Sequence, residues 1–270
     1  MPTIETSPGQ HLFYEAQGTG ERTAVFSHSY VCDGRQFEAQ AQALGEAGWR
    51  TLVYDHRDHG RSGAATSSYE LEDLVQDGLS VLDQLGGEGP VDWIGLSTGG
   101  FVGMRIAARH PERIRRLVLM DTSAAREPGL KRMNYELLLL GLRMVGIKGV
   151  LPAASKSLFG RSFLKDPSQR ALKQAWLERM AAYDPKGLHR FGKAIFGRPD
   201  FIPELPAITA PTLVLVGAED VSTPVARAEE LATGIPGATL QVIPGAGHLS
   251  TIEAPEETSA HILAHLQAAD

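Results

Sequence analysis

Short apolar runs alternate with longer amphipathic segments along most of this chain. The runs have the near-continuous apolar character of strands that are buried on both faces of a parallel sheet, and they occupy residues 12–16, 23–27, 50–54, 92–95, 116–120, 212–216 and 239–243. Helix-period patterns lie between them, at 34–47, 69–85, 98–110, 224–234 and 255–267. This alternation predicts an α/β fold with a doubly wound, mostly parallel sheet.

The alternation is interrupted once. Between residues 123 and 205 only helical patterns occur, such as "LKRMNYELLLLGLRMVG", before a proline-rich stretch leads back to the sheet. We therefore predict a core domain formed by residues 1–122 and 206–270, with residues 123–205 inserted as a helical cap. The most apolar stretch, "ELLLLGLRMVGIKGVL", contains Arg143, Lys148 and three glycines, and we expect it to be too short and too interrupted to span a bilayer.

The composition of the chain limits which partners and which cellular compartment we expect for the protein. A net charge of −6 over 270 residues argues against nucleic acid or an anionic membrane as a partner. The single cysteine, Cys32, excludes an internal disulfide and indicates a reducing compartment, and we expect it to be a small apolar filler. The first ten residues show no signal-peptide pattern, so a soluble cytoplasmic protein is expected. The sequence leaves a homodimer open.

One serine stands among glycines at the junction of a predicted strand and a predicted helix. Gly95-Leu96-Ser97-Thr98-Gly99 fits the pattern G-x-S-x-G in the strand–turn–helix context that this pattern requires. A tight turn of this kind raises the serine hydroxyl above the sheet edge as a nucleophile. The backbone N–H of Thr98, in the first helical turn, lacks an intrahelical partner and is free to stabilise an oxyanion.

A serine nucleophile needs a base, and the base needs an orienting acid. Among nine histidines, His248 follows a strand and a glycine-rich loop at the place from which a base can reach the sheet edge. In the order serine, acid, histidine, Asp220 is the predicted acid because its strand should neighbour the one that leads to His248. Asp121 is expected to support the entrance to the cap, and Glu219 to point away from the site.

No cofactor or metal is expected. His261 and His265 are four residues apart on a predicted helix, but no third metal ligand accompanies them. Residues 187–194 approach a phosphate-binding loop, yet they end in Ala194 and follow no strand.

Five segments in order resemble the motifs of serine hydrolases with the α/β-hydrolase fold: "FSHSYVCDGRQF", "YDHRDHGRS", "GLSTGGFVG", "LVGAEDVSTP" and "GAGHLSTIEAPEE". Within that family the chain is most similar to the 3-oxoadipate enol-lactonase and esterase branch. The resemblance implies that the Tyr30 N–H is the second oxyanion donor and that the Tyr30 side chain lines the pocket. Ser29 and Asp58 depart from the usual glycines of these motifs.

We therefore expect hydrolysis of small to medium uncharged carboxylic esters or lactones through an acyl-enzyme. The helical pattern of the insertion is apolar nearly all round, which predicts an enclosed chamber lined by Met133, Leu138 and Leu142 besides Tyr30. Three alternatives stay open: cleavage of C–C bonds in meta-cleavage products, peroxide exchange as in cofactor-free perhydrolases, and a ligand receptor on the same fold.

Overall fold

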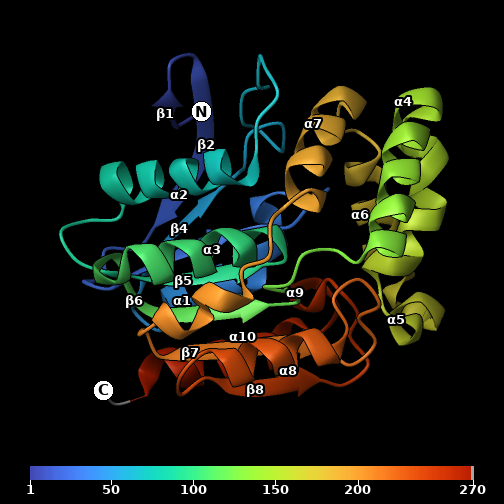
Figure 1. Cartoon of the computed structure of the whole chain (residues 1–270). Coiled ribbons are helices and arrows are strands. Elements are labelled where there is room, and N and C mark those ends of the chain that lie inside the picture. Colours follow the sequence, from blue (N-terminus) through green and yellow to red (C-terminus); the bar gives the residue numbers. More distant parts are fainter. Residues whose placement is uncertain (269–270) are drawn as a thin grey trace.

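A computed structural model describes residues 1–268 of the chain, and an eight-stranded sheet forms its centre (Figure 1). Its strands are β1 (Thr3–Ser7), β2 (Gln10–Gln17), β3 (Thr23–Ser27), β4 (Arg50–Tyr54), β5 (Val91–Leu96), β6 (Ile114–Met120), β7 (Thr212–Gly217) and β8 (Thr239–Ile243). The order in the sheet is β1-β2-β4-β3-β5-β6-β7-β8. β2 is antiparallel to both of its neighbours, and the pairs from β4 to β8 are parallel. The predicted doubly wound, mostly parallel sheet is confirmed.

Helices cover both faces of the sheet (Figure 1). One buried cluster joins the sheet to α2 (Leu71–Leu85), α3 (Thr98–Arg109) and α8 (Val225–Gly234), and the other joins it to α1 (Glu38–Glu46) and α10 (Pro255–Gln267). Side chains of β6 alternate between the clusters, since Leu117 and Leu119 enter the first while Val118 and Met120 enter the second. This two-sided burial explains the continuously apolar strands.

The segment between β6 and β7 holds no strand. It contains α4 (Gly129–Leu158), α5 (Arg161–Lys165), α6 (Arg170–Met180) and α7 (Pro185–Phe196), which stand together at the right of the sheet in Figure 1. The remaining short helices are α9 (Ser250–Glu253) and the 3-10 turns Gly34–Phe37, Pro111–Arg113, Pro167–Gln169 and Ile202–Ala207. We keep the division into a core and a cap (residues 123–205) as a proposal.

The longest helix, α4, is broken in the middle. Gly146 has φ 70° and ψ 177°, so the element consists of two helical pieces that meet at a kink. Contrary to our expectation, α4 is long and apolar enough to cross a membrane, because the helix extends beyond the apolar stretch at both ends; among the described helices it is the one that meets this criterion. The kink nevertheless divides it into pieces of about five and about three turns.

Candidate active site

Ser97 occupies a strained turn between β5 and α3. Its φ of 52° lies in the left-handed region, which a non-glycine residue adopts at a cost. The turn requires glycines beside it: a Cβ on Gly99 would lie 1.8 Å from the carbonyl oxygen of Ser27, and one on Gly95 would lie 2.2 Å from that of Gly99. The backbone of Ser97 is held by its N–H bond to the Met120 oxygen, at 2.8 Å.

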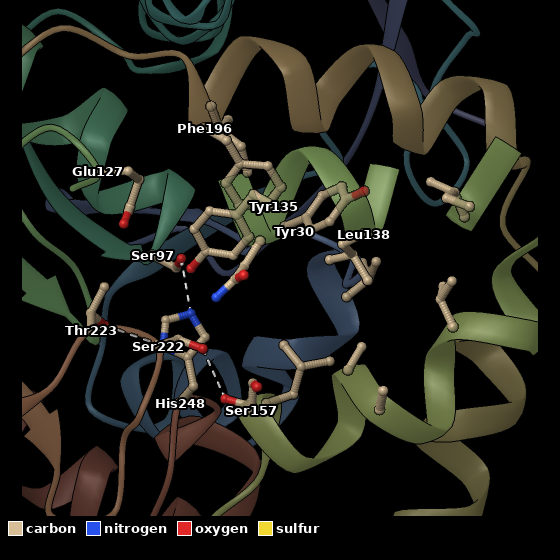
Figure 2. A pocket seen from close by; sticks show the side chains of 18 of the residues that line it. Tyr30, Ser97, Glu127, Tyr135, Leu138, Ser157, Phe196, Ser222, Thr223 and His248 are labelled. Atoms are coloured by element: carbon tan, nitrogen blue, oxygen red, sulfur yellow. Dashed lines mark hydrogen bonds between the residues drawn. The ribbon is translucent and has the colours of Figure 1, made fainter. Parts of the chain in front are cut away.

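The structure brings Ser97, His248 and Asp220 into one hydrogen-bonded chain. Ser97 Oγ lies 3.0 Å from His248 Nε2 (Figure 2), and His248 Nδ1 lies 2.8 Å from Asp220 Oδ2. Asp220 is held in turn by the backbone N–H groups of Ser222 and Thr223, at 2.7 and 2.9 Å, and by the Thr223 hydroxyl, at 2.7 Å. With its Nδ1 proton directed at the carboxylate, His248 presents the lone pair of Nε2 to the serine.

The charges of the pair favour an imidazolium. Burial works against the charged form of Asp220, but attraction to His248 and the hydrogen bonds from His248 and Thr223 outweigh it and lower the pKa of this carboxyl. Burial likewise opposes protonation of His248, but the neighbouring Asp220 carboxylate outweighs it and raises the pKa of the imidazole. His248 is thereby a stronger base than an ordinary histidine.

Asp121 follows the last residue of β6, two residues before the predicted cap begins. It turns inward at φ 44° and is fully buried, because its carboxyl accepts bonds from the backbone N–H of Gly217, at 2.8 Å, and from the Ser250 hydroxyl, at 2.6 Å. These two residues flank the segments that carry Asp220 and His248, so Asp121 fastens the acid loop to the histidine loop. Burial, with a further contribution from the charge of Asp220, raises the pKa of Asp121 to about 8.

Two backbone N–H groups, from residues that flank Ser97 in the chain or share the lining of its cavity, are unengaged. Within residues 1–268, neither the Thr98 nor the Tyr30 backbone N–H donates a hydrogen bond to the protein. The loop that carries Tyr30 is fixed at its next residue, because the N–H of Val31, which has φ 55°, donates to His59 Nε2 at 3.2 Å. No pattern in the sequence indicated this role for His59.

His59 belongs to a buried group of histidines under that loop. Its ring lies 5.4 Å from that of His28, which in turn lies 4.6 Å from that of His56. Burial lowers the pKa of His28 to about 4 and that of His59 to about 3, so both rings are neutral near pH 7. A neutral ring can accept the Val31 N–H.

A cavity of about 370 Å³ opens in front of Ser97 and His248 (Figure 2). Tyr30, Leu138 and Leu142 line it, as the sequence predicted, but Met133 does not. Met133 is 54% exposed because it stands on a face of α4 that points away from the cavity. A pattern that is apolar nearly all round cannot tell which of its faces turns inward.

Two further features of the cavity wall were missed in the sequence. Tyr135 and Phe196 stack with ring centroids 3.9 Å apart and planes within 3°, joining α4 to the end of α7 (Figure 2). A buried ion pair joins Glu127 and Arg198 at 2.8 Å, and Lys131 approaches the same carboxylate at 3.4 Å. Contacts such as the stack and the Glu127–Arg198 pair form between residues far apart in the chain, so spacing gives no signal for them.

Among the described residues, no group of three or more histidine, cysteine, aspartate or glutamate side chains is arranged to hold a metal ion.

Residues 25–255 match the family model described as the alpha/beta hydrolase fold. The chain belongs to this family. As an α/β hydrolase it is 28% identical to the non-heme haloperoxidase of Rhodococcus erythropolis, over 99% of this chain and 100% of the relative. It is also 28% identical to 3-oxoadipate enol-lactonase 2 of Acinetobacter baylyi, over 91% and 89%.

Solved structures of α/β hydrolases agree with this assignment. The enol-lactonase from Burkholderia xenovorans LB400 superimposes with a TM-score of 0.91 at 28% identity, covering 99% of this chain and 100% of that one. Family and relatives together identify the protein as an enzyme with hydrolase activity, and they support the resemblance to the enol-lactonase branch.

Proposed function

We propose that this α/β hydrolase cleaves carboxylic esters or lactones through an acyl-enzyme formed on Ser97. The observation that carries the proposal is the chain Ser97–His248–Asp220, with distances of 3.0 and 2.8 Å, at the mouth of an apolar cavity. Nucleophile, base and orienting acid are the three groups that acyl transfer needs. The names of an enol-lactonase and a haloperoxidase relative are consistent with acyl chemistry.

In the proposed mechanism, Ser97 Oγ attacks the substrate carbonyl while His248 Nε2 takes its proton. Asp220 stabilises the imidazolium, and the Thr98 and Tyr30 N–H groups bind the oxyanion. His248 then protonates the leaving alkoxide, which departs as alcohol or, for a lactone, stays attached to the acyl group. Water, deprotonated by His248, then attacks the acyl-enzyme. When the resulting tetrahedral intermediate breaks down, His248 returns the proton to Ser97 Oγ and the acid is released.

The cavity favours small to medium uncharged substrates. Apolar side chains such as Leu138 and Leu142 dominate its wall. Arg198, a cation of this wall, is already paired with Glu127. Lys131, near the wall, pairs with the same carboxylate and also donates to the Ser222 carbonyl. Binding a substrate carboxylate there would compete with these contacts.

The test is a nucleophile variant. Ser97→Ala should lower kcat/KM for p-nitrophenyl butyrate by about 10⁴-fold or more, because triad members act as a unit. A phosphonate ester should label Ser97 in the parent, as located by peptide mass spectrometry. Ser168→Ala, a change at an exposed serine of the cap, is the control and should leave both readouts unchanged. Labelling at Ser29 or Cys32 would contradict the proposal.

The haloperoxidase relative favours one second candidate, peroxide exchange. In that reaction hydrogen peroxide replaces water as the group that accepts the acyl from Ser97, and a peracid leaves. Acetate and hydrogen peroxide should then give peracetic acid at a rate that exceeds ester hydrolysis. If hydrolysis is faster on the same preparation, the hydrolytic assignment holds.

A further inference from the structure

The first half of α4 carries a row of exposed apolar side chains. Their positions along the helix are separated by 3, 4, 3 and 4 residues, and they are Leu130 (71% exposed), Met133 (54%), Leu137 (59%), Leu140 (51%) and Met144 (75%). This is the a/d spacing of a heptad repeat, which places the residues in a single straight row suited to packing against another helix. We call these five residues the α4 seam.

The fold of one chain does not use the seam. The same helix packs inward through other residues: Leu139 and Leu142 are buried, and Tyr135 and Leu138 face the cavity. Val145, 63% exposed, adjoins Met144, whereas other exposed large apolar side chains among the described residues, such as Leu172 and Val242, lie on other elements. A continuous apolar row of this kind is unusual on a monomer and marks a contact surface.

A second copy of the chain fits the seam when the two helices run antiparallel. Placing Leu137 opposite Leu140 of the other copy also places Met133 opposite Met144, and the two-fold axis repeats each pair. Four layers then form, each with one a residue and one d residue, which is the packing that antiparallel helices adopt. The surface is its own complement, as an isologous interface requires.

The charges beside the seam select the same arrangement. Glu136 and Arg143 occupy equivalent flanking positions one heptad apart, so in the antiparallel pair Glu136 of each copy meets Arg143 of the other. A parallel pair would instead bring Glu136 beside Gly141 and would form no such charge pair.

We propose that the protein forms a two-fold homodimer through antiparallel pairing of the α4 seams. The pairing does not depend on the proposed catalytic chemistry. It has a consequence for the site, because the helix that forms the interface also supplies Tyr135, Leu138 and Leu142 to the cavity wall. Dimerisation holds that wall in place from outside.

The first test is the mass in solution. Light scattering after gel filtration should give twice the 29.1 kDa of the chain for the parent. Leu137→Glu buries a charge in the central layers of the interface and should halve the mass. Leu172→Glu, at an exposed apolar position of α6 outside the seam, is the matched control and should stay dimeric.

The second test is specific to the register. Glu136→Arg alone places an introduced arginine against Arg143 in both pairs, and Arg143→Glu alone places glutamate against glutamate, so each variant should be monomeric. Mixing the two variants makes both pairs attractive and should restore a dimer that contains one copy of each. Glu136 also contacts Lys193 of its own chain at 2.9 Å, so far-UV circular dichroism and Tm must show that each variant is folded.

A monomeric parent at all concentrations would overturn the proposal. So would a monomer that co-sediments with phosphatidylglycerol vesicles through the seam, since this would assign the surface to a membrane. Folded single-charge variants that remain dimeric alone would also overturn the register. None of these results bears on the labelling of Ser97, so the two proposals fail separately.

Discussion

Two buried carboxyl groups, those of Asp220 and Asp121, lie near His248, and their different hydrogen-bond partners give them different roles. Asp220 contacts the ring directly and has a lowered pKa, whereas Asp121 contacts Gly217 and Ser250 and has a raised one. Carboxyl pairs with opposed pKa values divide into a charged partner and a neutral one. We therefore assign Asp220 to orienting the base and Asp121 to holding the loops.

Asparagine variants separate these roles. Asp220→Asn should lower kcat by about 10⁴-fold, because the amide permits the wrong tautomer of His248. Asp121→Asn should retain most of the activity, since an amide can still accept from the Gly217 N–H and exchange a bond with the Ser250 hydroxyl. Steady-state kinetics with one ester compares them. The reverse ranking would move the orienting role to Asp121.

The pH dependence should report His248 itself. Since the neutral ring is the base, kcat/KM should rise with pH through its pKa, and the raised pKa moves this limb above the ordinary histidine value of about 6.5. The residual activity of Asp220→Asn should rise at lower pH than the parent's, because the burial that lowers the pKa remains while the carboxylate is gone. A limb that stays in place in the variant would point to a different base.

At the scale of single residues, the sequence predicted the three residues of the proposed triad but not the residues that support them through contacts in the fold. Ser97, Asp220 and His248 follow from the order of motifs along the strands, and the structure brings them within hydrogen-bonding distance. The support from His59 to Val31 joins residues 28 positions apart, and nothing in the local pattern of either one signals it.

At the scale of elements, the turn from β5 into α3 depends on close backbone approach. Gly99→Ala places a Cβ 1.8 Å from the Ser27 oxygen of β3, and backbone on both sides leaves little room to shift. We expect a loss of about 3 kcal/mol or more in the free energy of unfolding.

A glycine in an open helical site provides the control. A Cβ on Gly45 in α1 meets nothing within 4 Å, so Gly45→Ala should add about 0.5–1 kcal/mol. Urea titration followed by circular dichroism measures both changes. Equal midpoints for the two variants would show that the turn tolerates a side chain.

Strands were predictable where apolar and β-branched residues form a run, in the buried β3 and β4 and also in β8, whose one buried side chain is Ile243. β3, β4 and β8 begin and end where the sequence predicted, at residues 23–27, 50–54 and 239–243. β1 was missed because it is polar, with Ile4 as its one buried side chain, and it is a strand only through pairing with β2. Whether such an edge segment forms a strand depends on the strand with which it pairs rather than on its own sequence pattern.

At the scale of the whole molecule, we expect the insertion between β6 and β7 to control which substrates reach Ser97. Because Arg198 of the wall is already paired with Glu127, a neutral butyrate ester or butyrolactone should be hydrolysed with higher kcat/KM than 3-oxoadipate enol-lactone. Glu127→Gln should shift the ratio toward the charged lactone, since it frees Arg198 and Lys131. A strong preference of the parent for the charged lactone would reverse this assignment.

Because Cys32 is buried, the rate at which its thiol reacts can be used to measure transient opening of the loop beside it. This thiol is the only one in the chain, it is fully buried beside the Tyr30–Val31 loop, and burial raises its pKa to about 12. Disulfide reagents react with the thiolate, which the native state neither forms nor exposes. The rate of colour release from 5,5′-dithiobis(2-nitrobenzoic acid) should therefore follow the transient loosening of this loop, and an inhibitor bound covalently at Ser97 should slow it.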